Sequence, residues 1–294
     1  MAANISLKQL KVFTTLIRHK TLTSASESLY LSKAAVSMAI SELEKQIGHA
    51  LFDRINNRLI LNQEGQKLLP LADELLQRTN EIERLFGKDD ALSGQLRIGA
   101  SDTIGNQVAP TLLSRFRQSY SHDWQSLFIS NTTLICQKLI DYELDIGLVE
   151  GKVDQTEISS CAFSKDEMCI ICPPNHPLAN ISASGIDELE NENWVLREAG
   201  SGSREFFVTK IAPQLENWHE SFQLNTTESL INSVSAGLGL GCLSSLSARH
   251  AIQDGRVCAI ELPIDMSRQF WILLHKEKYQ SPLLKQFIEF CHHN

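Results

Sequence analysis

The sequence predicts an α/β protein with a mostly helical N-terminal head and a larger body in which strands and helices alternate. Three observations support this prediction. Residues 21–47 have the pattern of two short helices with a tight break between them, and residues 65–88 that of one long helix. From residue 95 onward, short apolar runs alternate with helical patterns, as in an α/β fold. A chain of 294 residues suits about two domains.

The second of the two short helices has one apolar face and one small, polar face. Ser32 is a good N-cap for it, as Thr23 or Ser24 is for the helix before it. Its apolar residues recur at spacings of three and four and are Val36, Ile40, Leu43 and Ile47. The opposite face lacks bulk, which suits a helix that enters the major groove of DNA. The residues predicted to face the bases are Ser32, Ala34, Ser37, Met38 and Ser41.

An ordinary packed pair of helices is the alternative on spacing alone. The next residues favour DNA binding, because residues 51–62 have the pattern of a short hairpin with a basic tip, a wing beside the helix pair. Arg54 and Arg58 in this wing, together with Lys33, are predicted to contact phosphates or the minor groove. The long helix that follows carries more apolar residues than a small domain needs. Part of it is therefore predicted to pack against a second subunit.

The order of helix, helix-turn-helix, wing and long helix resembles that of the LysR-type transcriptional regulators. The resemblance covers roughly the first 65 residues and rests on Leu10, Phe13, Ala25, Leu29, Ser32, Ala35, Val36, Ser37, Ile40, Leu43, Glu44, Gly48, Leu51, Phe52, Arg54, Leu61, Glu64 and Gly65. It implies a dimer that binds an interrupted palindrome in double-stranded promoter DNA, and a homotetramer built from two dimers. It also implies a two-lobed, periplasmic-binding-protein-like effector domain.

Charge is divided unevenly along the chain. The net charge is −8, which excludes a wholly basic nucleic-acid binder. Residues 1–65 nevertheless hold eight Lys and Arg against five Asp and Glu, as a DNA-binding domain attached to an acidic body would. The first ten residues contain no apolar run, so we expect neither a signal peptide nor a membrane partner, and a cytoplasmic protein. The seven cysteines, without paired spacing, fit reduced thiols there.

The body divides into two units by its strand pattern. Short strands are expected at residues 96–100, 127–130 and 145–149, and a second unit begins near residue 166 with a strand at 168–172. The chain returns through a strand at 270–275 and a closing helix, and the sheet is expected to be largely parallel. The predicted domains are a winged helix-turn-helix at 1–65, a linker helix and hinge at 66–92, and an effector domain at 93–294. Within the last, lobe I comprises 93–163 and 268–294, and lobe II comprises 164–267.

Polar stretches at residues 100–103, 130–133 and 200–204 follow predicted strands or open predicted helices. Ligands collect at such edges of α/β sheets, although helix capping explains each stretch taken alone. Together, in matching positions of the two lobes, they favour a small anion or polar metabolite between the lobes. The residues predicted to bind it are Ser101, Thr103, Asn131, Glu150, Gly202, Ser203, Arg204 and Thr227.

Two of these residues carry charges that need explanation. Arg204 has the fork geometry for an oxyanion, with pairing to a neighbouring acid as the alternative. Glu150 ends a buried strand inside the predicted cleft, where a carboxylate repels an anion unless it is protonated or bridged by a hydrogen-bond donor.

Segments 145–151, 197–205 and 237–244 resemble the branch of the family that contains regulators of sulphur assimilation and sulphite response, alongside regulators of carbon fixation. This resemblance implies an inorganic oxyanion such as sulphite as an effector. One alternative is an oxidant sensor that uses Cys161, Cys242 or Cys258. A solute-binding module and an enzyme are weaker alternatives, since no nucleophile–base pair, metal set or cofactor motif is visible. The CxxC spacing of Cys169 and Cys172 lies on a predicted strand, where the two side chains face opposite ways.

Overall fold

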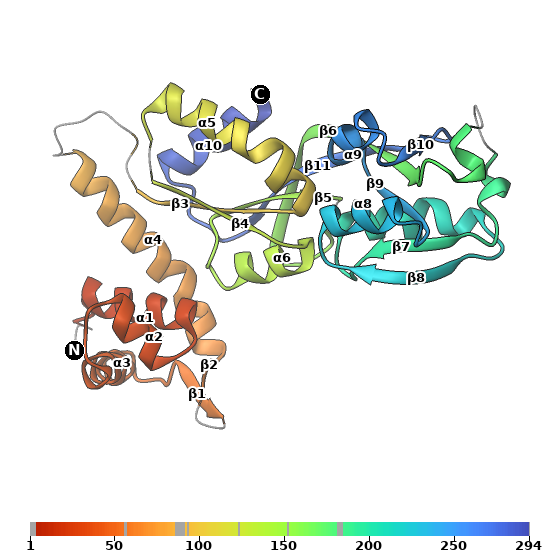
Figure 1. Ribbon diagram of the computed structural model, residues 1–294. Coiled ribbons are helices and arrows are strands. Elements are labelled where there is room, and N and C mark those ends of the chain that lie inside the picture. Colours follow the sequence, from red (N-terminus) through yellow and green to blue (C-terminus); the bar gives the residue numbers. More distant parts are fainter. Residues whose placement is uncertain are drawn as a thin grey trace.

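The computed structural model describes residues 4–55, 58–85, 92, 94–122, 124–151, 153–180 and 185–293. Figure 1 shows a helical head, one long helix that leaves it, and an elongated body whose two lobes lie end to end. No helix within those described ranges is long and apolar enough to span a membrane.

The head contains three helices and a two-stranded antiparallel wing, as predicted. Its elements are α1 (Leu7–His19), α2 (Leu22–Ser28), α3 (Lys33–Ile47), β1 (Phe52–Ile55) and β2 (Arg58–Leu61). The side chain of Ser32 accepts a hydrogen bond from the Ala35 amide at 3.1 Å, so the predicted N-cap of α3 is confirmed. The predicted cap of α2 is wrong. That helix begins earlier, and Thr21 accepts from the amide of Ser24 at 3.2 Å.

The long helix α4 (Gln63–Leu85) presents different residues to different sides. Leu69, Ala72 and the carboxylate of Asp73 are buried, whereas three large apolar side chains remain 48–59% exposed. These three are Leu71, Leu75 and Ile82. The end of the helix predicted at residues 86–88 and most of the hinge lie outside the described residues.

Lobe I has three parallel strands in the order β4–β3–β5. Its elements are β3 (Leu96–Ala100), η1 (Ile104–Val108), α5 (Ala109–Tyr120), β4 (Gln125–Ile129), α6 (Thr132–Ile140), β5 (Ile146–Glu150) and α10 (Pro282–His293). Phe116 and Phe287 pack edge to face in its core, with ring centroids 5.0 Å apart. Such pairs fill a core layer between helices and sheet.

Lobe II continues the same sheet with further parallel strands. Its elements are η2 (Pro177–Asn180), η3 (Ile186–Leu189), β7 (Asn193–Arg197), α7 (Gly202–Phe206), η4 (Phe207–Ile211), η5 (Ala212–Gln214), β8 (His219–Leu224), α8 (Thr227–Ser235), β9 (Leu240–Ser244), α9 (Ser245–Gln253) and β10 (Cys258–Ile260). Trp194 is fully buried at its centre and stacks against Phe207, with ring centroids 4.5 Å apart.

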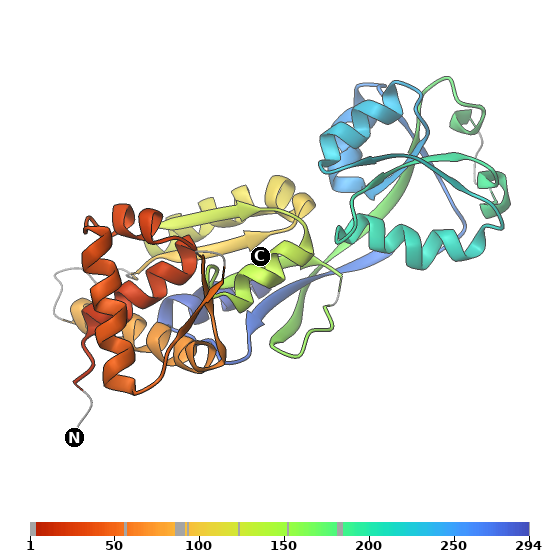
Figure 2. The same ribbon diagram turned by 90° about the horizontal axis from the view of Figure 1, so that it is seen from below.

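Two long strands, β6 (Ile158–Cys172) and β11 (Ser267–His275), join the lobes. They pair with each other antiparallel from Glu167 opposite Ser267 to Ile158 opposite His275. Figure 2 shows them crossing together from one lobe to the other. The prediction of a largely parallel sheet is therefore wrong at its centre, because these strands run antiparallel to each other and to β5 and β9. The predicted strand at 168–172 is only the lobe II end of β6.

Candidate DNA interface and effector cleft

The face of α3 predicted to meet DNA is open to solvent. Ser32, Lys33, Ala34 and Ser41 are exposed, Ser37 is half-buried, and Met38 is 73% exposed. The opposite face of the helix holds Val36 and Leu43, which are fully buried in the core of the head. This division leaves the polar face of α3 available to enter a groove.

The wing supplies a second exposed edge beside α3. Arg54 is exposed and its backbone lies opposite Leu59 in the hairpin. The backbone of Arg58 lies opposite Ile55, but its side chain is outside the described part of the chain. Tyr30, just before α3, is 96% exposed and has a positive φ of 53°. Sequence reasoning missed Tyr30. The available signal was a large aromatic residue two positions before the predicted N-cap Ser32.

The lobe I side of the cleft is buried and internally hydrogen-bonded. Ser101, Thr103 and Glu150 all lie at the carboxyl ends of β3 and β5, and each is at most 5% exposed. The amide of Thr103 donates to the Glu150 carboxylate at 3.1 Å. This hydrogen bond satisfies one Glu150 oxygen within lobe I, and the carboxylate still repels an anion placed next to it.

Lobe II closes onto lobe I through polar contacts. The amide of Thr227 donates to the Asp102 carboxylate at 3.2 Å, and the Arg197 guanidinium lies 3.3 Å from the same carboxylate. The side-chain amide of Asn131 donates to Glu198 at 3.1 Å. The predicted residues Asn131 and Thr227 thus lie at the lobe junction.

Gly202 and Ser203 open α7 at this junction, and Gly202 lacks room for a larger side chain. A Cβ atom on Gly202 would lie 2.7 Å from Glu150 Cβ and 2.8 Å from its carbonyl oxygen. Glycine therefore lets the start of α7 approach the end of β5. Ser203 is 4% exposed.

Arg204 has the partner that sequence reasoning named as its alternative. Its two terminal nitrogens donate to the two carboxylate oxygens of Glu220, each at 2.7 Å, and Nη1 also donates to the Arg197 carbonyl. The hydrogen bond from Arg204 holds the pKa of Glu220 below its usual range. Both terminal nitrogens of the fork are thus engaged within lobe II, and the guanidinium faces an acid rather than an open site.

Two other arginines occupy the lobe junction, and sequence reasoning missed both. Arg197 donates to Thr227 Oγ1 at 2.9 Å and to Glu198 at 2.9 Å. Arg268, whose side chain is 6% exposed, donates to Asp166 at 2.6 Å and to Thr103 Oγ1 at 3.3 Å. Its Nη1 is buried without a hydrogen-bond partner in the described ranges. The signal was an arginine at the end of an otherwise apolar strand, in Trp-Val-Leu-Arg and Arg-Gln-Phe-Trp.

Among the described cysteines whose thiol pKa is shifted, none has a lowered pKa that would activate it. All seven are free. Burial raises the pKa of the Cys169 and Cys172 thiols to about 11, and it also raises the pKa of Cys161 and Cys242. Since the thiolate is the form that reacts with oxidants, these environments disfavour oxidant sensing by these four thiols. Within the described part of the chain, no three metal-ligating side chains come together.

Two family models match the chain and together cover most of it. The model of the bacterial regulatory helix-turn-helix protein, lysR family, matches residues 7–66, and that of the LysR substrate binding domain matches residues 89–294.

Three of the similar proteins are transcriptional regulators. The transcriptional regulator YeiE of Escherichia coli is 35% identical over 98% of this chain and 97% of its own length. The RuBisCO operon transcriptional regulator of Allochromatium vinosum is 30% identical over 98% of this chain and 95% of its own. CysL of Bacillus subtilis is 29% identical over 94% of this chain and 98% of its own.

Two solved structures share the fold. A full-length OxyR variant from Pseudomonas aeruginosa superposes with a TM-score of 0.78 at 18% identity, over 99% of this chain and 95% of that one. The regulatory domain of CcmR from Synechocystis, in complex with 2-PG, superposes with a TM-score of 0.64 at 21% identity. The superposition covers 68% of this chain and 97% of the CcmR domain.

The close approach of Gly202 to Glu150 gives a testable prediction. Gly202→Ala should lower the free energy of unfolding by about 1–3 kcal/mol, because the new methyl group meets backbone atoms that cannot move aside cheaply. Denaturant unfolding would measure the loss. Gln223→Ala, at an exposed position on β8, is the control and should leave the midpoint unchanged. Equal midpoints for the two variants would show that the lobes do not meet here.

Proposed function

Since the chain belongs to the LysR family of transcriptional regulators, we propose that a small effector bound between its lobes alters how its head engages promoter DNA. The chain is a DNA-binding transcriptional regulator with an effector-binding domain, and it is not an enzyme. The observation that carries the proposal is the set of buried polar groups that both lobes direct at one junction, around Asp102, Arg197 and Arg268.

The proposed assembly places two heads on one DNA site. Residues 1–65 bind DNA, residues 66–92 link and dimerise, and residues 93–294 bind the effector. The exposed apolar residues Leu71, Leu75 and Ile82 of α4 support pairing with a second subunit, and two such dimers would form the tetramer. A protein with this task acts where the chromosome lies, so we place it in the cytoplasm.

In the proposed DNA complex, the exposed face of α3 enters the major groove. Ser32, Ala34, Ser37, Met38 and Ser41 contact base edges in this arrangement. Lys33, Arg54 and Arg58 contact phosphates or the minor groove, and the Tyr30 hydroxyl reaches a phosphate. Base contacts give specificity and phosphate contacts give affinity.

Arg54 provides the test of DNA binding. Arg54→Ala should weaken binding to the DNA upstream of the protein's own gene about equally across sequences, and should reduce the slope of log K against log salt by about 1. Gel-shift titrations at several salt concentrations would measure both. Lys285→Ala, at an exposed position of α10 in lobe I, is the matched loss of charge and should change neither. Absence of DNA binding by the parent protein at any low salt would refute the DNA-binding role itself.

We propose a small inorganic oxyanion such as sulphite as the effector. Ser101, Thr103, Asn131, Gly202, Ser203 and Thr227 supply hydroxyl, amide and backbone N–H groups at the junction. The unpartnered Nη1 of Arg268 supplies a buried donor. The regulatory domain of CcmR was solved in complex with 2-PG, which supports a small ligand held by this domain. With Arg204 engaged by Glu220, Arg197 and Arg268 are the guanidinium groups left to face it.

The charge balance sets how such an anion would bind. Asp102, Glu150, Asp166 and Glu198 bring four carboxylates to the junction, against the two guanidinium groups of Arg197 and Arg268. An added anion is repelled unless it replaces one of these carboxylates as a partner of an arginine. Binding would therefore break an internal ion pair, and the Asp102–Arg197 pair is one that spans the lobes.

Calorimetry with sulphite and with sulphate tests the oxyanion. We expect measurable heat for at least one of them, and at least a tenfold weaker affinity in Arg268→Gln because a buried donor is lost. Ser203→Ala should weaken binding less. Arg249→Gln, exposed on α9, is the matched control, and thermal unfolding would confirm that each variant is folded. If neither anion gives heat with the parent protein, the effector belongs to another chemical class.

A further inference from the structure

The linker helix α4 meets lobe I at a buried charge cluster formed by Arg18, Asp73, Arg97, Asp145 and Lys278. Asp73 belongs to α4, and its side chain is only 2% exposed. We propose that Asp73 is the positioning residue that fixes the head against lobe I, and that the cluster sets the orientation at which α3 meets DNA.

Asp73 is surrounded by cations from three separate parts of the chain. Lys278, in the turn after β11, places Nζ 2.6 Å from Asp73 Oδ2. Arg18, near the end of α1 in the head, places Nη2 3.4 Å from Oδ1. Arg97, on β3 of lobe I, places Nη2 3.6 Å from the same oxygen. One carboxylate thus holds together head, linker and lobe I.

Asp145, just before β5, completes the cluster from the lobe I side. It accepts from Arg97 Nη2 at 2.5 Å and Nε at 3.0 Å, and its Oδ1 lies 2.8 Å from Lys278 Nζ. Burial by itself would raise the pKa of Asp145, but Lys278 and Arg97 hold that pKa well below its usual range. Asp145 is therefore ionised and already engaged by lobe I.

The charge count makes Asp73 the sensitive member. Three cations share two carboxylates, so removal of Asp73 would leave three cations around Asp145 alone. A buried charge that loses its partner is strongly destabilising where it stays buried, and exposure to water relieves it. Burial, and then the nearness of Arg97, lower the pKa of Arg18 to about 10, although a third of its side chain remains exposed. Without Asp73, the favourable response is separation of α4 from lobe I.

Other polar contacts between the head or α4 and lobe I are more exposed than this cluster. Lys20, whose side chain is 65% exposed, lies 3.2 Å from Glu143 and 3.7 Å from Asp141. The Tyr279 hydroxyl donates to Glu81 at 3.0 Å, and Arg78 lies over the Tyr279 ring. Solvent-exposed ion pairs of this kind contribute little. They cannot replace the buried cluster.

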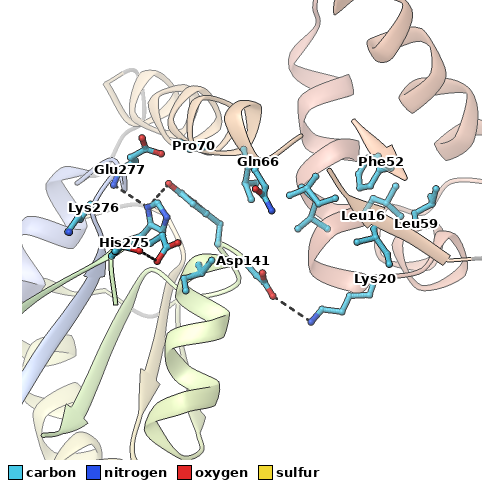
Figure 3. A pocket seen from close by; sticks show the side chains of 18 residues that line it. Leu16, Lys20, Phe52, Leu59, Gln66, Pro70, Asp141, His275, Lys276 and Glu277 are labelled. Atoms are coloured by element: carbon cyan, nitrogen blue, oxygen red, sulfur yellow. Dashed lines mark hydrogen bonds and ion pairs between the residues drawn. The ribbon is translucent and has the colours of Figure 1, made fainter. Parts of the chain in front are cut away.

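Close to these contacts, the head and lobe I enclose a cavity of about 780 Å³, while the buried Tyr142 of lobe I packs into the apolar core of the head. Figure 3 shows Leu16, Phe52 and Leu59 of the head on one side and His275 of lobe I on the other. The ion pair between Lys20 and Asp141 spans the space between them. Because much of this space is unfilled, the geometry of the junction depends on the packing of Tyr142 and on the polar contacts around it, among them the buried cluster.

The cluster also lies at the far ends of the strands that lead to the effector cleft. β3 carries Arg97 near its start and Ser101 just after its end, and β5 joins Asp145 to Glu150. β11 begins next to Arg268 and leads to Lys278. Strands of five residues span about 16 Å as stiff units. A displacement of residues in the effector cleft would therefore be transmitted to the cluster. This consequence rests on the proposed effector function.

Hydrogen–deuterium exchange and DNA bending test the role of Asp73 without any effector. In the full chain, Asp73→Asn should raise exchange of the α4 amides at least tenfold while leaving β7–β9 of lobe II unchanged. The bend of the upstream DNA, measured by circular-permutation gel shift, should change, while affinity stays within about threefold because α3 and the wing are untouched. Asp73→Glu should restore the parent bend in part.

Two variants serve as control and cross-check. Glu74→Gln removes the next carboxylate of the same helix, which pairs with Arg78 on the exposed side at 2.8 Å, and should leave exchange and bending as in the parent. Lys278→Gln removes the cation from the lobe side and should reproduce the changed bend. Should Asp73→Asn fail to fold, Lys278→Gln decides the matter alone. Parent-like exchange and bending in the folded variants would overturn the proposal, whatever the outcome with sulphite.

Discussion

The antiparallel pairing of β6 with β11 is the constraint on which the rest of the effector domain depends. These strands run together through both lobes, so neither lobe can twist without bending a shared ladder. The same pairing places Arg268 opposite Asp166 at the lobe junction and carries the chain on to Lys278 at the opposite end of lobe I. Cleft and head junction are therefore two ends of one hydrogen-bonded element, and the loops between strands contribute side chains to both.

The lobe junction is held closed by charges that an effector would have to displace. Arg197 of lobe II reaches Asp102 of lobe I, and the Thr227 amide joins the same carboxylate. Glu150 and Asp166 meanwhile share the guanidinium of Arg268. An internal carboxylate competes with an added anion for the same arginine. The affinity for the anion therefore depends on how easily the lobes separate. Such a cleft favours ligands that bind arginine more strongly than a carboxylate does, and a ligand of this kind would change lobe geometry as it binds.

The head was predictable because its signals are local. Ser32, the spacing of Val36, Ile40 and Leu43, and the basic hairpin all act within a few residues. The first part of β6 was missed because residues 158–167 are largely polar, and their partner strand lies about a hundred residues away. The choice between Arg204 and Arg197 as the cleft arginine could not be made either. It depends on Glu220, which a parallel strand brings beside Arg204.

The role of Asp73 could not be predicted from local patterns either. An acidic residue in a long helix usually faces water, and its partner Lys278 is 205 positions away. Its burial gives α4 two distinct tasks. Leu71, Leu75 and Ile82 point outward, where a second subunit would cover them, while Leu69, Ala72 and Asp73 face inward. A helix fixed on one side to its own lobe and on the other to a partner helix cannot rotate for one without disturbing the other. Movement of lobe I against α4 would then change the separation of the two heads, the distance that a palindromic DNA site measures.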